Sequence, residues 1–307
     1  MKKSQNSVQA YLTYCEKSKR LDEKTVRAYR TDLRQFVKVT GSECQAGAVS
    51  VKIIEDYIAG LNSTYKPKTV KRKIASVKAF FHYLEYRGAV KQNPFHTLHM
   101  KLREPLILPR TIPLKDVESL LRTVNSYHNN AITVYQKRKS LCDLAVIELL
   151  FATGIRISEL CALTPDAVDL REGVLLIYGK GDKERRIQIG NRDVLKRIKE
   201  YATEFYEEIE QSGYFFSNTS GKRVSDQSVR RMLKKYAESA GLTQHITPHM
   251  LRHTFATSLL EADVDIRYIQ KMLGHSSISV TEIYTHVAMA KQKSILVSKH
   301  PRNKFSL

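Results

Sequence analysis

Three cationic side chains lie where a helix face or a helix end would present them together. His249 and Arg252 are three residues apart, so one helix would project both from the same face. Arg156 follows Gly154 just past an apolar segment, where a helix is expected to end. The chemistry open to arginines is stabilisation of negative charge, because a guanidinium clamps two oxygens through paired N–H donors and a lysine cannot. Each residue alone is also compatible with an ordinary surface or capping role.

A histidine and a tyrosine follow in the next part of the chain. Gly274 is expected to end a helix, so that the chain turns sharply and presents His275. Tyr284 lies nine residues beyond this histidine, between Ile283 and Thr285. A tyrosine oxygen is a moderate nucleophile and also a good leaving group, so a covalent bond that it forms is reversible. The ordinary alternatives are a capping histidine and a half-buried tyrosine.

Several familiar sites are excluded by single residues. Glu184 stands where a dinucleotide-binding fingerprint needs its third glycine, and Phe216 stands where a P-loop needs its first glycine. Met250 occupies the position of the glutamate base in a zinc-protease helix. No cluster of three or four carboxylates suggests a two-metal nuclease. We therefore expect neither a metal nor another cofactor.

The charge of the chain favours a polyanionic partner. Its 307 residues include 51 Lys and Arg against 31 Asp and Glu, a net charge of +20. Nucleic acid is the commonest partner of so basic a folded chain, although a basic surface that binds nothing is the alternative. No apolar run reaches the ~20 residues of a membrane helix, no signal peptide is visible, and the four cysteines show no paired spacing. We expect a cytoplasmic, nucleoid-associated protein with reduced thiols and no membrane partner.

The first ninety or so residues show helical periodicity. One apolar stripe begins after Asp22, a plausible cap, and a second runs from Val70 to Leu84 and ends near Gly88. The second helix also carries a run of cations that meets no acidic residue before Glu85. A face of one sign is best explained by phosphate contacts. The predicted DNA-binding residues in this run are Lys66, Lys68, Lys71, Arg72 and Lys73.

Prolines separate this region from the rest of the chain. We expect a helical domain over 1–97, a linker over 98–110 and a second domain over 111–307. In the second domain the pattern predicts a helix from near Pro113, a loop over 125–130 and a helix over 141–153. Two short β runs, 174–178 and 186–189, flank a basic hairpin tip, and helices follow from about 193. The predicted fold class is mainly α with a small antiparallel β-sheet.

Five segments in this order and spacing resemble the conserved boxes of the tyrosine recombinases, also called the phage integrase family. They are the first arginine box at 152–160 (ATGIRISEL), the lysine hairpin at 179–185 (GKGDKER), the His-x-x-Arg box at 247–257 (TPHMLRHTFAT), the second-histidine box at 273–277 (LGHSS) and the nucleophile box at 281–287 (TEIYTHV). The resemblance is strongest to the Xer-type recombinases and integrases. It implies a helical, SAM-like core-binding domain and a catalytic domain that together form a clamp on DNA.

The resemblance also implies a role for each residue. Tyr284 would attack a DNA phosphodiester and form a 3′-phosphotyrosyl intermediate, while Arg156 and Arg252 hold the phosphate. Lys180 would protonate the leaving 5′ oxygen, His249 would handle the tyrosine proton, and His275 would donate a hydrogen bond to the phosphate. Lys183 is the alternative acid, or else a DNA-backbone contact. Glu159 is expected to brace Arg156 or to cap locally.

The same resemblance implies the reaction and the assembly. The chain would recombine, and in a mobile element integrate, DNA at inverted-repeat core sites through a Holliday junction, without metal or ATP. It would act as a homotetramer on DNA, with a C-terminal helix near 289–299 docking on a neighbouring subunit, and with a related recombinase or a DNA-bending factor as a possible accessory. The alternatives are a topoisomerase-like nicking-closing enzyme and a DNA-binding accessory protein that does not cut. The target site, and the choice among integration, excision, inversion and chromosome-dimer resolution, are not encoded in these residues.

Overall fold

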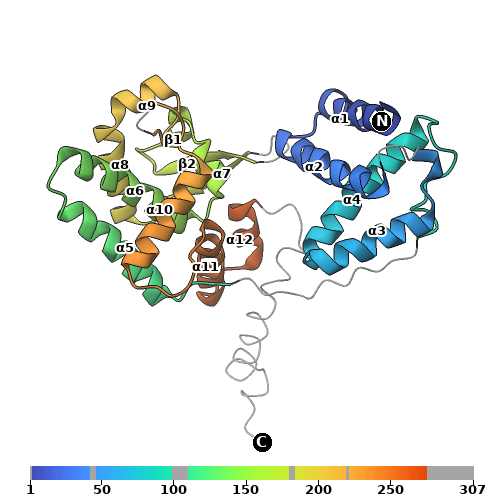
Figure 1. Ribbon diagram of the computed structural model, residues 1–307. Coiled ribbons are helices and arrows are strands. Elements are labelled where there is room, and N and C mark those ends of the chain that lie inside the picture. The colour runs from blue at the N-terminus through green and yellow to red at the C-terminus, as the bar shows by residue number, and fades with distance from the viewer. Residues whose placement is uncertain (1, 42–45, 99–109, 180–183, 219–220, 275–307) are drawn as a thin grey trace, which may run out of the picture. The chain divides into compact units, whose positions relative to one another are not determined.

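The computed structural model describes residues 2–41, 46–98, 110–179, 184–218 and 221–274. The chain divides into two compact units, Met1–Ile107 and Leu108–Leu307, which are considered separately (Figure 1). Nearly all of the predicted linker 98–110 falls outside the described residues. The domain limits at 97 and 111 therefore stay predictions.

Every secondary-structure element described in the N-terminal unit is a helix. Its elements are α1 (Lys2–Lys17), α2 (Glu23–Thr40), the 3-10 turn η1 (Ala46–Ala48), α3 (Val51–Thr64) and α4 (Pro67–Tyr86). Asp22 caps α2 by accepting a hydrogen bond from the Thr25 backbone N–H at 2.9 Å, as predicted. Ser50 caps α3 in the same way, and Pro67 occupies the first turn of α4. Local sequence therefore sets where these helices begin.

Aromatic side chains hold the four helices together. The Phe36 ring of α2 meets the Tyr57 ring of α3 edge-on at 5.0 Å and the Phe81 ring of α4 at 5.9 Å. The predicted stripe on α4, from Val70 to Leu84, is buried along its whole length. The core thus forms where the predicted apolar stripes of α2 and α4 pack against α1 and α3.

The basic run on α4 does not form one exposed face, and this corrects the sequence prediction. Lys73 is 4% exposed, and its ammonium lies 3.1 Å from the Asp32 carboxylate of α2. Arg72 pairs with the same fully buried carboxylate, which also accepts a hydrogen bond from the Ser76 hydroxyl at 2.8 Å. A buried ammonium cannot meet a phosphate at the surface, so Lys73 is removed from the exposed set. Lys66, Lys68 and Lys71 remain exposed.

The C-terminal unit is mainly helical with one small sheet. Its described elements are α5 (Leu114–Asn129), α6 (Val134–Thr153), α7 (Ile157–Cys161), the 3-10 turn η2 (Pro165–Ala167), β1 (Val168–Asp169), β2 (Val174–Tyr178), β3 (Glu184–Gln188), α8 (Arg192–Glu204), α9 (Tyr206–Ser212), α10 (Asp226–Ser239), α11 (Pro248–Glu261) and α12 (Ile266–Leu273). The predicted fold class, mainly α with a small antiparallel sheet, is confirmed.

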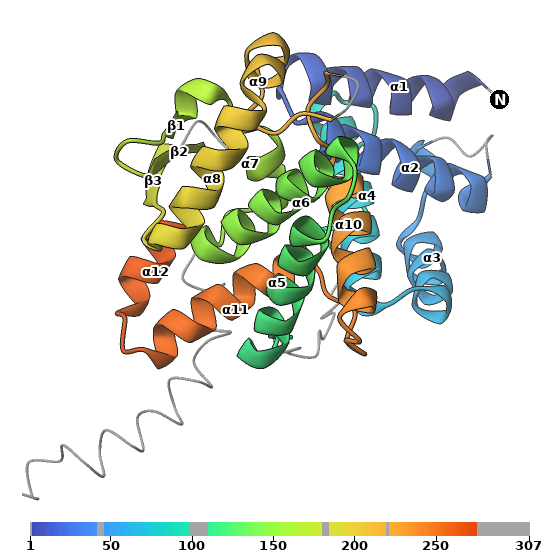
Figure 2. The same cartoon turned by 90° about the vertical axis from the view of Figure 1, so that its left-hand side faces the viewer.

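Helix α6 is the centre of this unit. Figure 2 shows it surrounded by other helices, and it packs against α5, α8, α10 and α11. Its buried residues lie on every side, as in a helix enclosed by others. The residues that follow α6, including Arg156, are therefore attached to the most enclosed element of the unit.

Two predictions about α5 and α6 need correction. The expected loop at 125–130 is wrong, because α5 continues to Asn129 and buries Val124 and His128 one turn apart. The His128 imidazole hydrogen-bonds with the Ser140 hydroxyl at 3.2 Å, which attaches the end of α5 to α6. The helix predicted over 141–153 exists but begins at Val134, where Thr133 forms a capping box with Gln136.

The predicted hairpin forms the larger part of a three-stranded antiparallel sheet of order β1-β2-β3. Strands β2 and β3 pair with Val174 opposite Gln188 and Tyr178 opposite Glu184. Leu175, Ile177 and Ile187 are buried on one face, which attaches the sheet to the core of the unit. The basic hairpin tip was predicted between these strands, and its residues 180–183 lie outside the described residues.

No helix in the described part of the chain is long and apolar enough to cross a membrane. No group of three or more His, Cys, Asp or Glu residues in that part is placed to hold a metal ion. Cys15, Cys142 and Cys161 are not bonded in disulfides, and Cys44 lies outside the described residues.

Candidate active site

The turn that carries Arg156 requires glycine. Helix α6 ends at Thr153, and Gly154 takes the left-handed conformation with φ +61°. A Cβ at this position would lie 2.5 Å from the Phe255 ring and 3.0 Å from the Leu273 side chain. The backbone of Gly154 thus packs directly against α11 and α12. The chain then leads within two residues to Arg156, which caps the start of α7.

Glu159 fixes Arg156 from one side. Its carboxylate accepts the Arg156 backbone N–H at 2.7 Å and the Arg156 Nη1 at 2.9 Å. This confirms that Glu159 braces Arg156. The Arg156 side chain is 35% exposed and Glu159 is 7% exposed, so the arginine faces outward from a buried acid. The guanidinium is held in place and stays accessible.

Arg185 of β3 is the second partner of Glu159. Its Nη1 and Nη2 donate to the two carboxylate oxygens at 3.0 Å and 2.7 Å, a bidentate pair. Burial alone would raise the pKa of the Glu159 carboxyl, but the hydrogen bonds from Arg185 and Arg156 outweigh it and hold that pKa below its ordinary value. Glu159 is therefore ionised whenever its arginines are in place.

Arg252 approaches from α11 and is 5% exposed. Thr247 and Pro248 start this helix, and the Thr247 hydroxyl accepts the Met250 backbone N–H at 3.3 Å. The Arg252 guanidinium donates to the Gly154 carbonyl and to the Leu273 carbonyl, both at 2.7 Å. These carbonyls belong to the C-terminal ends of α6 and α12, where a cation is favoured by the helix dipole. Arg252 thereby joins three helices at one point.

The end of α12 brings the arginines together. The successive carbonyls of Met272, Leu273 and Gly274 accept hydrogen bonds from Arg185 at 2.8 Å, from Arg252 at 2.7 Å and from Arg156 at 3.4 Å. Gly274 closes the helix with φ +65°, as predicted. A formal count of three arginines and one glutamate leaves the cluster with a charge of +2. Such a cluster is suited to a dianionic or developing anionic group.

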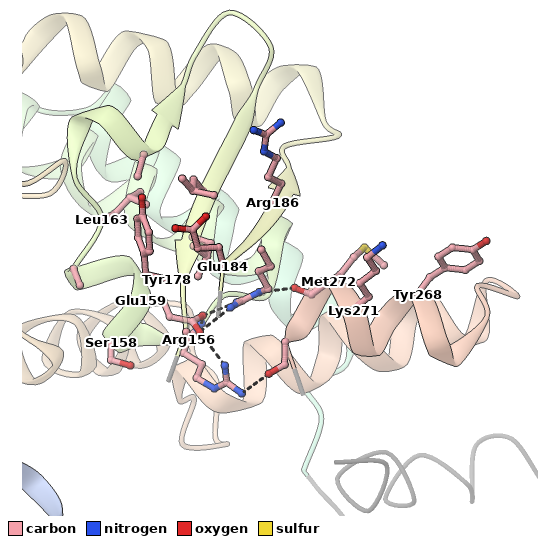
Figure 3. Close-up of a pocket in the computed structure, with 17 residues that line it drawn as sticks. Arg156, Ser158, Glu159, Leu163, Tyr178, Glu184, Arg186, Tyr268, Lys271 and Met272 are labelled. Carbon is pink, nitrogen blue, oxygen red and sulfur yellow. Dashed lines mark hydrogen bonds and ion pairs between the residues drawn. The ribbon is translucent and has the colours of Figure 1, made fainter. Parts of the chain in front are cut away.

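A hollow of about 1210 Å³ opens beside this cluster, between the sheet and α12 (Figure 3). Its walls include Arg156, Glu159, Tyr178, Arg185, Tyr268 and Lys271. The close-up shows Arg156 and Glu159 on one wall, with their contacts reaching toward the end of α12. His249 and Arg252 are not among the described residues that line it. The arginine cluster thus forms one edge of the hollow.

Two histidines lie on α11 next to Arg252. His249 is exposed, and it shares a helix with Arg252 at the predicted spacing. His253 is half-buried, and burial, followed by the positive charges of His249 and Arg252, lowers the pKa of its imidazole. His253 is therefore held toward its neutral form. Its half-buried place on α11 is typical of a structural residue.

Four predicted site residues lie outside the described residues: Lys180, Lys183, His275 and Tyr284. The described residues end at Gly179, just before Lys180, and at Gly274, just before His275. Both glycines line the hollow. The roles of these four residues stay predictions.

Sequence reasoning missed Arg185 as a site residue. It stands within the hairpin box at 179–185, but nothing in a local pattern distinguishes it from its neighbours. Its partners Glu159 and Met272 lie 26 residues before it and 87 residues after it. The only available signal was an arginine on a strand whose alternation turns it toward the core, next to the buried Ile187.

Comparisons with known proteins agree with the predicted family and fold. The description "Phage integrase family" matches residues 110–291, and "Phage integrase, N-terminal SAM-like domain" matches residues 8–88. A "Tyrosine recombinase" of Agathobacter rectalis is 58% identical over 305 residues, covering 99% of each chain. "Tyrosine recombinase XerC" of Thermodesulfovibrio yellowstonii is 34% identical over 319 residues, again covering 99% of each chain.

Solved structures share the fold. The XerH site-specific recombinase bound to palindromic difH substrate has a TM-score of 0.75 at 19% identity, covering 94% of this chain and 84% of that one. A lambda integrase tetramer bound to a Holliday junction has a TM-score of 0.67 at 18% identity, covering 89% and 77%. The chain belongs to the phage integrase family, the tyrosine recombinases, as its boxes predicted. Its relatives include Xer-type recombinases.

Proposed function

We propose that this tyrosine recombinase cuts and rejoins DNA at specific sites through a covalent bond between Tyr284 and a DNA 3′-phosphate. The observation that carries the proposal is the arginine cluster at the end of α12. Arg156 and Arg252 reach adjacent carbonyls there, of Gly274 and Leu273, from two different helices. In the sequence, His275 follows Gly274 immediately, and Tyr284 comes nine residues after His275.

In the proposed step, the Tyr284 oxygen attacks the phosphorus of a phosphodiester. The bond from phosphorus to the 5′ oxygen breaks, and Lys180 donates a proton to that oxygen while His249 takes the proton of the tyrosine. Lys183 is the alternative acid. Negative charge gathers on the non-bridging oxygens, where Arg156 and Arg252 clamp it and His275 donates a further hydrogen bond.

The phosphotyrosyl bond conserves the energy of the phosphodiester. Attack by the 5′ hydroxyl of another strand reverses the first step and joins the strands, so no ATP is consumed. The cationic groups supply the charge neutralisation that a metal ion provides in other phosphoryl-transfer sites. Exchange of one pair of strands and then the other passes through a Holliday junction.

DNA binding outside the active site is assigned to exposed cations. Lys66 at the N-cap of α4 and Lys68 and Lys71 on α4 are exposed, and Arg72 is also exposed while it pairs with Asp32. We propose that this helix contacts the DNA backbone, together with Lys183 at the hairpin tip, because phosphate contacts dominate affinity for DNA. The two units would then close on the duplex as a clamp.

The proposed assembly is a homotetramer on two inverted-repeat core sites. Each site needs two subunits, and a lambda integrase of this fold is described as a tetramer bound to a Holliday junction. The segment at 289–299 is proposed to dock on a neighbouring subunit. A related recombinase or a DNA-bending factor could complete the complex, and the place of action would be the bacterial nucleoid. Removing the chain after Val287 should abolish cooperative assembly, and unchanged assembly would exclude the docking.

The proposal is tested by trapping protein–DNA adducts. The purified chain is mixed with nicked duplexes prepared from its source DNA in the presence of EDTA, then denatured, and the captured ends are sequenced. We expect adducts that share one short inverted repeat. Tyr284→Phe should bind this DNA normally and form no adduct. Tyr206→Phe, which changes an exposed tyrosine of α9 away from the hollow, is the matched control and should retain adducts.

Each other outcome selects an alternative. Loss of cleavage with EDTA would identify a metal-dependent nuclease. Tight binding without adducts would leave two readings, an accessory protein or a recombinase that lacks its partner. Adducts without recombined product would identify a nicking-closing enzyme.

A further inference from the structure

Arg185 connects three parts of the site through one side chain. Its Nη1 and Nη2 bind both oxygens of Glu159 on α7, and its Nε donates to the Met272 carbonyl on α12 at 2.8 Å. The side chain itself projects from β3 and is only 10% exposed. A planar guanidinium with donors on two edges can make this connection, whereas a lysine has a single ammonium.

The contact between Arg185 and Glu159 changes the net charge around Arg156. Glu159 is buried and ionised, and Arg156 is its other cation. A carboxylate with one arginine would largely cancel the charge of that arginine. With two arginines on the same carboxylate, the group keeps one net positive charge, and Arg156 is the more exposed of the two. Arg185 therefore satisfies the acid from inside while Arg156 faces outward.

We propose that Arg185 is a positioning residue for DNA strand cleavage: it neutralises Glu159 and holds the end of α12, so that Arg156 keeps its place and its charge for the phosphate. The proposal deepens the proposed function and rests on it. Arg185 itself does not touch the DNA in this account. It acts through Glu159 and the Met272 carbonyl.

The geometry of Gly274 supports the same role. A Cβ at Gly274 would lie 3.0 to 3.2 Å from three atoms of the Arg185 side chain. The guanidinium therefore packs directly on the backbone that Arg156 also contacts, through the Gly274 carbonyl. A shift of the Arg185 side chain would therefore move the Gly274 backbone and, through its carbonyl, Arg156.

The test uses the rate of adduct formation on nicked duplex at saturating DNA, with DNA affinity and thermal unfolding measured beside it. Arg185→Gln should slow cleavage by about 10- to 100-fold, and its DNA affinity should change by less than about twofold, because only the positioning of a charged donor is lost. Arg122→Gln removes an exposed arginine that pairs with Glu118 on α5, and it serves as the matched control. It should cleave at the wild-type rate.

Charge rescue separates positioning from simple structural support. The double variant Arg185→Gln/Glu159→Gln has no Glu159 carboxylate to offset the positive charge of Arg156. Its cleavage should therefore be at least about fivefold faster than that of Arg185→Gln alone. Arg185→Lys should fall between the wild type and Arg185→Gln, and it replaces that variant if glutamine prevents folding. Wild-type cleavage by Arg185→Gln, or a double variant no faster than the single one, would overturn the proposal.

A second readout does not depend on cleavage. Hydrogen exchange over residues 266–274 should be faster in Arg185→Gln than in the wild type, because the Met272 carbonyl loses its arginine, and it should be unchanged in Arg122→Gln. Unchanged exchange in Arg185→Gln would overturn the positioning role. If the wild-type chain formed no adducts, the proposed function would fail, while this measurement would still decide whether Arg185 holds α12.

Discussion

Each unit of the chain contains a buried carboxylate that binds two cations, and the two clusters differ in what surrounds them. Asp32 of α2 holds Arg72 and Lys73, both from α4, and it is completely buried. Gln35 of α2 accepts a hydrogen bond from the Lys73 ammonium at 2.5 Å, and the ring of Tyr65, at the end of α3, lies 4.8 Å from that ammonium. This arrangement fastens α2 to α4.

Glu159 holds Arg156 and Arg185 from different elements, and its cluster ends on backbone carbonyls of α12. The Arg156 side chain remains on the wall of the hollow. The comparison shows that a run of basic residues does not by itself reveal which cations are available to DNA. Whether a cation is available depends on the acid with which it pairs in the folded chain. For Lys73 and Arg185 that acid lies far away in the sequence.

The largest effect is expected on stability at Asp32. Asp32→Asn leaves the Lys73 ammonium buried without its counter-ion, and loss of one partner of a buried pair typically costs about 3–5 kcal/mol. Urea unfolding of the full chain measures it. Glu118→Gln, which breaks an exposed pair with Arg122, is the control and should cost less than about 1 kcal/mol. Equal losses in the two variants would show that Asp32 does not fasten the helices.

Substitution of an arginine in the Glu159 cluster should affect catalysis rather than stability. Arg156→Lys keeps the charge but loses the paired donors, so adduct formation at saturating DNA should fall by about 10²–10³, or ~3–4 kcal/mol. The free energy of unfolding should change by less than about 1 kcal/mol, since the side chain is partly exposed. A lysine variant that cleaves at the wild-type rate would remove Arg156 from the site.

A pair of left-handed glycines sharpens the comparison further. A Cβ added at Gly88, whose φ is +67°, would have no described atom within 4 Å, whereas a Cβ at Gly154 would meet the Phe255 ring. Gly88→Ala should therefore cost only about 1 kcal/mol, the strain of the backbone. Gly154→Ala should cost about 2–3 kcal/mol and also slow cleavage, because Arg156 follows it. Similar losses of stability, with cleavage unaffected, would contradict the packing described for the α6–α7 turn.

The smallest effect is expected on DNA affinity from the exposed part of α4. Lys68→Gln should reduce the salt dependence of binding by about one unit of slope, since one phosphate contact is lost. Lys73→Gln should leave this slope unchanged, because Lys73 is buried against Asp32. Binding titrations at several salt concentrations measure both, and an equal change in slope would return Lys73 to the DNA interface.

The elements that could be predicted from the sequence are those with local signals. Asp22 and Pro113 mark helix starts, Gly274 marks a helix end, and the short apolar run at 174–178 marks a strand. The predicted loop at 125–130 failed because its polar residues lie on the outer face of a helix whose inner face buries His128. A cluster of Asn and Ser is typical of loops, and only the tertiary contact with Ser140 shows otherwise.

Candidate residues of the site could be named from the sequence, but the contacts among them could not be predicted. Arg156, His249 and Arg252 were identified by type and spacing within the family boxes. The pairings of Arg185 with Glu159 and of Lys73 with Asp32 join residues 26 and 41 positions apart. No periodicity connects such positions, because the fold alone brings them into contact.

The most direct test of the account identifies the residue that carries the DNA. Adducts of the wild-type chain are digested with nuclease and protease, and the peptide that bears the phosphonucleotide is sequenced by mass spectrometry. The account predicts a single modified peptide with the linkage on Tyr284. A linkage on Tyr178 or Tyr268, the exposed tyrosines that line the hollow in the described part of the chain, or on a serine, would contradict it.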